Sequence, residues 1–285
     1  MGPVDPSNEP SRDGINVSDR NNSPMANDPR RTELRAFLQS RRARLRPEDM
    51  GLPSAGRRRV AGLRREEVAA LAGVGVTWYT MFETGTAHGV SDSVVASVAR
   101  ALRLSKAERG HLAALAHNTS LPTGDTVVDP LILRALEHWI EAPAYVITTT
   151  WTVLAWNAAF ARVWAIEPPG SSPFNVVLWH FVDPVVRTMH GANWHAFAQT
   201  LVAMVRTGYG RHLHDESYLT LLETLREDPE FVAMWEQHDV SLTRVMTRGE
   251  IISPNVGPFR YEVLNLPLPT SDQQALVVQV PVSQA

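Results

Sequence analysis

The segment from Arg65 to Gly85, REEVAALAGVGVTWYTMFETG, constrains the fold more than any other part of the chain. Apolar side chains recur three and four positions apart on both sides of Gly73, which predicts two short helices over about 65–72 and 76–84. The side chains expected to face inward are Val68, Leu71, Ala72, Tyr79 and Phe82. Glycine suits the turn because it adopts positive φ without strain. Two short helices crossing at a tight turn predict a helix-turn-helix.

The flanking sequence completes a small all-helical domain. Helical periodicity over 32–45 predicts a helix before the motif, and similar patterns over 91–102 and 105–116 predict two after it. The last of these opens with Ser105 and Glu108, the spacing of a capping box. We therefore predict a five-helix domain over residues 31–120.

The outward face of the second motif helix is the candidate surface for reading DNA. The side chains expected near base edges are Val76, Thr77, Trp78 and Thr80, and those expected near phosphates are Arg57, Arg58, Arg59, Arg64 and Arg65. Two alternatives stay open. Trp78 could belong to the core, and the three arginines at 57–59 could form a solvated loop without contacting phosphates or a minor groove.

Charge is divided unevenly along the chain. Residues 31–120 hold 15 basic against 8 acidic side chains, whereas residues 121–285 hold 9 against 17. A basic block joined to an acidic one indicates that only the first faces a polyanion. Double-stranded DNA is accordingly the expected partner of the N-terminal domain.

Two segments are expected to lack a packed structure. Residues 1–30 are rich in Pro, Asn, Ser and Asp with few large apolar side chains, so we predict a disordered tail. Residues 121–130, LPTGDTVVDP, have the composition of a linker. Residues 131–285 then form the second domain.

The second domain mixes helical and strand patterns. Short β-rich runs over 145–149 and 152–156 flank a turn, and Asn157 can cap a helix that ends near Trp164. Further helices are expected around 131–140, 174–182, 193–207, 217–227 and 230–238, and strands over 242–247, 251–252, 259–266 and 276–280. Strands at both ends with helices between predict an α+β domain in which the terminal strands join the first hairpin in one sheet.

Seven of the eight tryptophans lie in this second domain. Aromatic side chains at such density are usually core, but together they can also line an apolar cavity with few polar anchors. The candidates for ligand binding are Trp156, Phe160, Trp164, Phe181, Trp194 and Phe197.

Other classes of site find little support in the sequence. His212, His214 and Asp215, or His190 with His195, could suggest a metal, but neither set has clean ligand spacing, so no metal or other cofactor is expected. Arg211 is expected to pair with an acid such as Asp215. The pair His238-Asp239 fits a structural hydrogen-bonded cluster better than an acid–base pair.

The chain has no cysteine, no membrane-length apolar run, and none of the GxSxG, GxxxxGK[ST], GxGxxG or HExxH motifs. We therefore expect a cytoplasmic protein that is not an enzyme and does not bind membranes.

Both halves resemble a known family. The segment LRREEVAALAGV with WYTMFETG is similar to XRE/Cro-type helix-turn-helix regulators. APAYVI (142–147), VLAWNAAFA (153–161), GRH (210–212) and PEFVAMWEQHDV (229–240) resemble the MmyB-like ligand-binding domain. The resemblance implies a transcription regulator whose C-terminal domain is PAS-like and holds a fatty-acyl-like ligand, and we expect it to act as a homodimer.

The chain departs from the family in its recognition helix. The family usually has Ser where this chain has Gly75, and commonly Arg where it has Met81. Several phosphate contacts expected from the family are therefore absent, and the nearby arginines could replace them. The alternative is a ligand-binding or protein-interaction protein with a non-functional helix-turn-helix, and salt-dependent binding to duplex DNA separates the two.

Overall fold

A computed structural model describes residues 28–52, 62–117, 126–168, 171–241 and 246–282. Most of the expected N-terminal tail and the arginine loop at 57–59 lie outside the described residues, as does the first half of the expected linker. The last residues assigned to the tail are ordered, because the first helix begins at Pro29, with Asp28 accepting a hydrogen bond from the backbone N–H of Arg30. Aspartate before proline is a favourable helix start, which explains why α1 begins before the predicted end of the tail.

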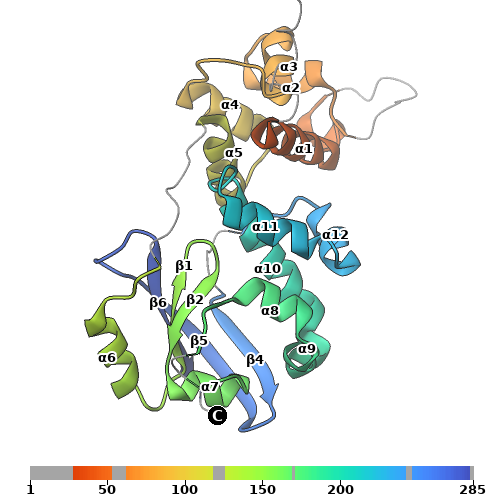
Figure 1. The fold of residues 1–285 in the computed structure, drawn as a ribbon. Coiled ribbons are helices and arrows are strands. Elements are labelled where there is room, and N and C mark those ends of the chain that lie inside the picture. Colours follow the sequence, from red (N-terminus) through yellow and green to blue (C-terminus); the bar gives the residue numbers. More distant parts are fainter. Residues whose placement is uncertain (1–27, 53–61, 118–125, 169–170, 242–245, 283–285) are drawn as a thin grey trace, which may run out of the picture.

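The described residues of the N-terminal region, 28–52 and 62–117, form a helical domain, as predicted (Figure 1). Its α-helices are α1 (Pro29–Arg44), α2 (Arg65–Ala72), α3 (Val76–Glu83), α4 (Asp92–Ala101) and α5 (Lys106–His117), with a short 3-10 turn η2 (Glu48–Met50) after α1. Gly73 ends α2 at φ 69°, so the turn uses the left-handed backbone that glycine allows. Ser105 and Glu108 form the expected capping box at the start of α5.

The core of this domain differs from the prediction at one position. Val68, Tyr79 and Phe82 are buried, whereas Leu71 is exposed to 37%. The α2 helix is only 8 residues long. Its inward face is therefore filled by Val68 and Ala69, and Leu71 lies on its flank.

The C-terminal region combines helices with strands. Its helices are α6 (Pro130–His138), α7 (Ala158–Trp164), α8 (Val176–Val182), α9 (Pro184–His190), α10 (Trp194–Tyr209), α11 (Glu216–Leu225) and α12 (Pro229–Trp235), with a 3-10 turn η3 (Gly191–Asn193). Its strands are β1 (Ala144–Thr148), β2 (Thr152–Trp156), β3 (Phe174–Asn175), β4 (Arg248–Ser253), β5 (Gly257–Pro267) and β6 (Gln274–Pro281). The α9 helix was not expected. The predicted strand over 251–252 lies within β4, and most of the predicted run over 242–247 lies outside the described residues.

The strands form one antiparallel sheet in the order β3-β2-β1-β6-β5-β4. The last strand, β6, pairs with β1, with Tyr145 opposite Val277. The first hairpin and the terminal strands therefore share a sheet, as the sequence pattern predicts. The expected α+β class with a PAS-like second domain is confirmed.

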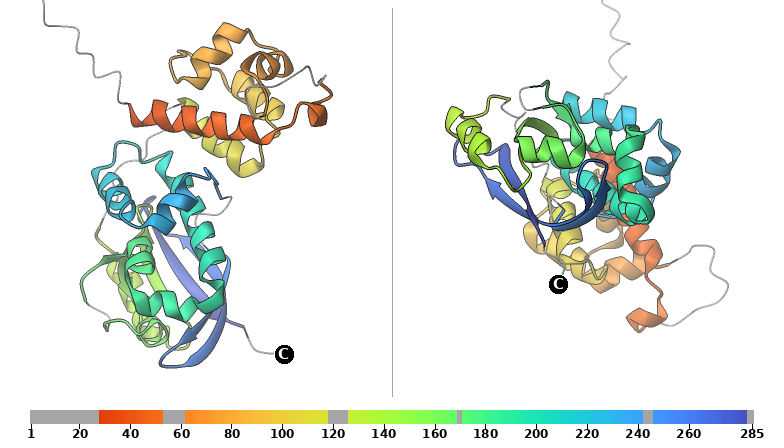
Figure 2. Two further views of the ribbon diagram at one scale, coloured as in Figure 1. Left: turned by 90° about the vertical axis from the view of Figure 1, so that its right-hand side faces the viewer. Right: turned by 90° about the horizontal axis from the view of Figure 1, so that it is seen from below.

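Alternation along the strands separates two apolar layers. Ala144 and Val146 face the α6 side with Leu276 and Val278, whereas Ile147 and Val277 belong to the larger core shared with the other helices. This period of two is that of a strand buried on both faces. In Figures 1 and 2 the helix α6 stands on one side of the sheet and α7 to α10 on the other.

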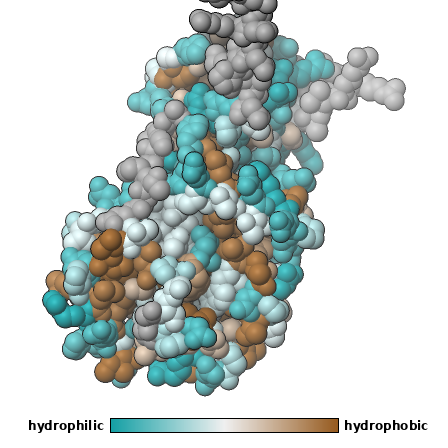
Figure 3. Space-filling model, viewed as in Figure 1, coloured by the Kyte–Doolittle hydropathy of each residue, from teal (hydrophilic) through white to brown (hydrophobic). Residues whose placement is uncertain are grey.

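The outer side of α6 carries exposed apolar side chains. Leu131 and Leu133 on the helix, and Ile140 just after it, are exposed to 62%, 39% and 73%. Figure 3 shows apolar surface at the place where Figure 1 draws α6. The helix is thus apolar on the face that covers the sheet and partly apolar on the face that meets solvent.

Candidate DNA-binding surface and ligand cavity

The exposed side of α3 provides the candidate DNA-binding surface. Val76 and Thr77 are exposed at its start, and Met81 is exposed one turn later. Trp78 is only half-exposed because its ring stacks on Phe82 with centroids 5.2 Å apart. Trp78 therefore fits both alternatives left open by the sequence, because part of its ring packs on the core and part stays accessible at the candidate DNA-binding surface.

Thr80 is also half-buried, and its hydroxyl donates to the carbonyl of Val76 at 2.9 Å. A hydroxyl engaged in this way keeps acceptor capacity for a base or phosphate contact. Of the four expected base-reading residues, Val76 and Thr77 are therefore the most accessible.

A buried carboxylate ties the helices of this domain together. The side chain of Glu83 is fully buried and accepts from the guanidinium groups of Arg65 and of Arg42, the latter at 3.1 Å. Arg42 also donates to the carbonyl of Leu63 at 2.5 Å. Arg65 is therefore an anchor for the helix-turn-helix, with 36% of its side chain still exposed. Arg64 is exposed.

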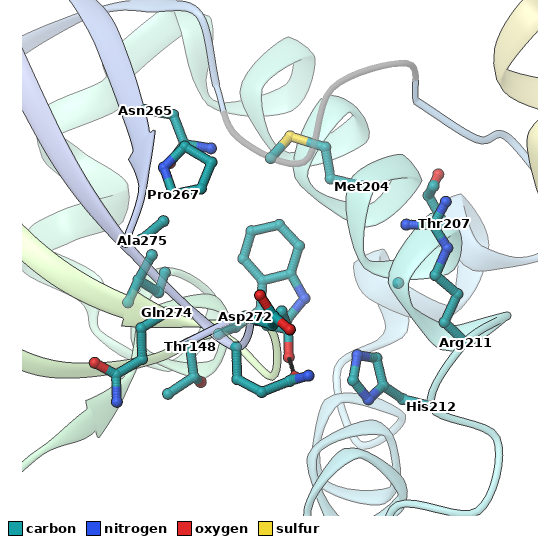
Figure 4. A pocket seen from close by; sticks show the side chains of 15 residues that line it. Thr148, Met204, Thr207, Arg211, His212, Asn265, Pro267, Asp272, Gln274 and Ala275 are labelled. Atoms are coloured by element: carbon teal, nitrogen blue, oxygen red, sulfur yellow. Dashed lines mark hydrogen bonds between the residues drawn. The ribbon is translucent and has the colours of Figure 1, made fainter. Parts of the chain in front are cut away.

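The C-terminal domain contains a cavity of about 160 Å³ at the C-terminal end of α10, which we call the polar cavity. Met204, Thr207 and Arg211 line one wall, and Asn265 and Ala275 of the strands line the other (Figure 4). The remaining lining residues are mostly polar, among them Thr148, His212, Asp272 and Gln273. The side-chain oxygen of Asn265 is buried there without a hydrogen-bond partner among the described residues.

A second, smaller cavity of about 50 Å³ lies deeper in the domain, and we call it the aromatic cavity. Three of the predicted ligand-binding residues line it, namely Phe160, Trp164 and Phe197. Burial lowers the pKa of His180, which lines the same cavity, to about 4. That ring is therefore neutral near pH 7, and the wall it forms is uncharged.

The other three predicted ligand-binding residues do not line this cavity. Trp156 points to a shallow surface hollow, and its indole N–H donates to the carbonyl of Glu167. Phe181 and Trp194 pack edge to face, 5.5 Å apart, within the helical layer. Aromatic composition alone could not separate the two groups, because it does not say which side of an element faces the cavity.

Trp151 stands between the two cavities and lines both, together with Ile147 and Met204. Its backbone has φ 70°, which is rare for a bulky side chain and costs on the order of 1–3 kcal/mol. Its indole N–H donates to the Tyr218 hydroxyl at 3.1 Å, and that hydroxyl donates to the carbonyl of Val205 in α10 at 2.6 Å. Trp151 is thus a strained partition whose position is linked to α10.

Gly208 allows this arrangement, since a Cβ there would lie 2.5 Å from the Tyr218 hydroxyl. Aromatic composition did not point to the residues of the polar cavity, but one sequence segment does. The segment GRH (210–212), noticed through its family resemblance, supplies Arg211 and His212.

His212 rather than Arg211 contacts Asp215, with Nδ1 and Oδ2 3.5 Å apart, so the pairing predicted for Arg211 is wrong. Arg211 forms no ion pair within the described part of the chain and lines the polar cavity. Burial lowers the pKa of His212, although Asp215 opposes this effect. Over the described ranges, no group of three His, Asp or Glu side chains is placed to hold a metal ion.

Comparison with protein families matches both halves of the chain. A helix-turn-helix domain model matches residues 33–112, and a model of the MmyB-like transcription regulator ligand binding domain matches residues 128–284. No curated protein matches the chain. No described helix has the length and apolar character needed to cross a bilayer.

Proposed function

Because the chain belongs to the MmyB-like transcription regulators, we propose that its C-terminal domain binds a small apolar, fatty-acyl-like molecule and thereby changes how the helix-turn-helix domain binds its operator. The chain is a DNA-binding transcription regulator with a ligand-binding domain. The matched families are regulatory, not enzymatic. The identity of the ligand and its effect on DNA binding are the proposed steps.

The observation that carries the proposal is the pair of adjoining cavities. The polar cavity offers the guanidinium of Arg211, which can donate to a carboxylate, whereas the aromatic cavity offers rings and aliphatic side chains. A molecule with a carboxylate at one end and a hydrocarbon chain at the other matches this pair of cavities, with the carboxylate in the polar cavity and the chain in the aromatic cavity. The cavities are smaller than the roughly 300–1,000 Å³ of typical ligand sites, so such a chain enters only if Trp151 moves.

The strained backbone of Trp151 favours that movement. A residue held at positive φ is kept there by its surroundings, and release of the strain offsets part of the cost of displacing the ring. Occupancy by an acyl chain therefore joins the two cavities into one channel.

For DNA, we propose that α3 enters a major groove with Val76 and Thr77 at base edges and with Trp78 and Thr80 beside them. Arg64, with the arginines at 57–59, would contact phosphates, and Arg65 would do so with the part of its side chain that Glu83 leaves exposed. A homodimer is expected because two-fold operators are read by paired recognition helices. Sedimentation of the full chain with and without a duplex tests that state.

The ligand proposal is tested by thermal unfolding of the full chain with dodecanoic acid, kept below its micelle concentration. A ligand at a hundredfold excess over Kd adds about 2.7 kcal/mol, or roughly 5–10 °C in Tm for a domain of this size. We expect this rise together with quenching of tryptophan fluorescence, and neither effect with ATP, because the cavities offer no glycine-rich phosphate cradle.

A matched pair of variants locates the effect. Ala275→Trp fills the polar cavity and should abolish the rise in Tm, whereas Ala196→Trp, on the exposed side of α10, should preserve it. An unchanged Tm for the wild-type chain with decanoic and dodecanoic acid would remove the fatty-acyl proposal.

A further inference from the structure

One face of α1 is turned toward the C-terminal domain. Glu33, Phe37, Arg41 and Arg44 follow each other at intervals of four, four and three positions and so share one side of the helix. The charged members of this set all contact residues far along the chain. Figure 2 shows α1 lying across the end of the C-terminal domain formed by its later helices.

The centre of this contact is a buried ionic cluster. Glu33 of α1 binds Arg206 of α10, and Arg206 is completely buried. His111 of α5 lies 3.6 Å from the same carboxylate oxygen of Glu33. Such a cluster is stable only while both domains are in place, because a charge left unpaired in a buried site is costly.

The rest of Arg206 is held by the C-terminal domain. Its guanidinium donates to the carbonyl of Trp235, and its central carbon lies 3.8 Å above the Trp235 ring. Arg206 is therefore held in one position by the C-terminal domain, and Glu33 of α1 forms its ion pair with Arg206 at that position.

A second contact lies at the other end of α1. Arg44 donates to the Gln237 carbonyl at 2.6 Å and to the Asp239 carboxylate at 2.8 Å, and Arg41 donates to the His238 carbonyl. These acceptors follow the C-terminus of α12, where the helix dipole places partial negative charge. The Asp239 carboxylate thus has a structural role at this contact, whereas Nδ1 of His238 is buried without a hydrogen-bond partner among the described residues.

The same segment of α10 forms the wall of the polar cavity. Thr207 and Gly208, which follow Arg206 directly, line that cavity, as does Met204 just before it. Gly210 lies so close to α5 that a Cβ would be 2.9 Å from the His111 ring. Residues 204–212 are thus in contact with the cavity on one side and with the DNA-binding domain on the other.

The recognition helix is remote from this contact. In Figure 1 and in the left view of Figure 2, α1 and α5 lie beside the C-terminal domain and α3 lies beyond them. A small displacement of α10 would therefore turn α3 without covering its exposed face.

We propose that residues 33, 111 and 206 form an interdomain joint that transmits occupancy of the cavity to the orientation of the helix-turn-helix domain. This inference rests on the proposed function for its ligand. An acyl chain that displaces Trp151 breaks the hydrogen bond from its indole N–H to the Tyr218 hydroxyl and leaves Tyr218, which donates to Val205 of α10, free to shift with that helix. The shift of α10 moves Arg206, and Glu33 and the whole of α1 follow it, because the ion pair is buried and cannot lengthen cheaply.

The absence of native cysteine makes the joint measurable by spin labelling. Labels on Ser93→Cys in α4 and Glu223→Cys in α11, both exposed, report the distance between the domains by double electron–electron resonance. In the full chain we expect dodecanoic acid to change the mean distance by on the order of 2 Å or more, the size of shift that packed helices make in such transitions.

Two variants and one control test the joint itself. Glu33→Gln should broaden the distance distribution without ligand and abolish the ligand-dependent change. Arg44→Ala, which alters only a half-exposed contact, should broaden it less and keeps the test available if Glu33→Gln folds poorly. Glu250→Gln removes an exposed ion pair with Arg260 on the sheet and should behave as the wild-type chain.

The outcomes separate the two proposals. If dodecanoic acid raises Tm and leaves the distance unchanged, the joint is refuted while the ligand proposal stands. If dodecanoic acid does not raise Tm, the ligand proposal fails. The joint is then tested by the distance distributions of the variants without ligand. A distribution in Glu33→Gln and Arg44→Ala as narrow as in the wild-type chain overturns it.

Discussion

Replacement of Glu33 by glutamine should lower the free energy of unfolding by an amount that depends on pH. Burial raises the pKa of Glu33, but the nearby His111 ring and the charge of Arg206 outweigh it and bring the pKa from its ordinary 4.5 to about 2. At about 1.4 kcal/mol per unit, this corresponds to roughly 3 kcal/mol that the ionised carboxylate contributes to the folded chain, in part through His111 of its own domain and in part through Arg206 of the other. Loss of one partner of a buried pair typically costs about 3–5 kcal/mol, which agrees.

The measured loss has an upper limit set by the structure. Glu33 and Arg206 belong to different domains, so the domains can separate and let water reach Arg206. The part of the loss that comes from the contact with Arg206 therefore cannot exceed the free energy of docking. We expect up to about 3 kcal/mol at pH 7, seen in urea unfolding as an earlier transition of the helix-turn-helix domain.

The sign of the pH dependence follows from the lowered pKa. The stabilisation is complete above the unfolded-state value near 4.5 and is lost as pH falls toward 2. The difference between the wild-type chain and Glu33→Gln should thus be constant from pH 7 to about 5 and shrink below it.

Two comparisons make the assay decisive. The double variant Glu33→Leu with Arg206→Met replaces the pair by apolar side chains and should recover most of the loss, since such replacements are often neutral. Glu250→Gln, whose carboxylate is 45% exposed, should cost about 1 kcal/mol or less. A loss in Glu33→Gln below about 0.5 kcal/mol at pH 7, or one that persists unchanged at pH 3, would refute the reasoning.

Three further expectations address the DNA surface and the fold. Thr77→Ala should weaken binding to a selected duplex by about 1–3 kcal/mol without lowering Tm, measured by fluorescence anisotropy; equal affinity would place the reading face elsewhere. Replacing Arg57, Arg58 and Arg59 by glutamine should weaken binding to all duplexes and reduce the salt slope by up to about 0.9 for each phosphate that is no longer neutralised, and an unchanged slope would return them to a solvated loop. Asn157→Ala removes four hydrogen bonds that join the start of β1, the start of α7 and the carbonyls of residues 139 and 142, so it should cost about 3 kcal/mol or more in urea unfolding.

Local signals predicted much of the fold. Gly73 marks the turn of the helix-turn-helix, and Asn157 caps α7 by accepting from the Phe160 N–H at 2.9 Å. Short runs of β-branched and aromatic residues on either side of a turn located β1 and β2. The α9 helix escaped prediction because its 7 residues follow α8 directly, and Asp183 ends one helix while capping the next.

The sites were less accessible to sequence reasoning. Phe160, Trp164 and Phe197 line the aromatic cavity, whereas the polar cavity depends on side chains from β5, β6 and α10 that only tertiary packing brings together. The interdomain joint joins residues 173 positions apart, and no periodicity links Glu33 to Arg206. A glutamate and an arginine at such positions have the sequence signature of ordinary surface residues.

The central claim, that ligand binding in the C-terminal domain alters DNA binding, is tested most directly by one titration. A duplex selected from a random pool by the full chain is titrated with the protein in the presence and absence of saturating dodecanoic acid at constant salt. We predict a change in Kd of at least about fivefold, the lower end of the range for coupling between linked sites. An identical Kd, under conditions where dodecanoic acid is shown to be bound by the rise in Tm, would contradict it.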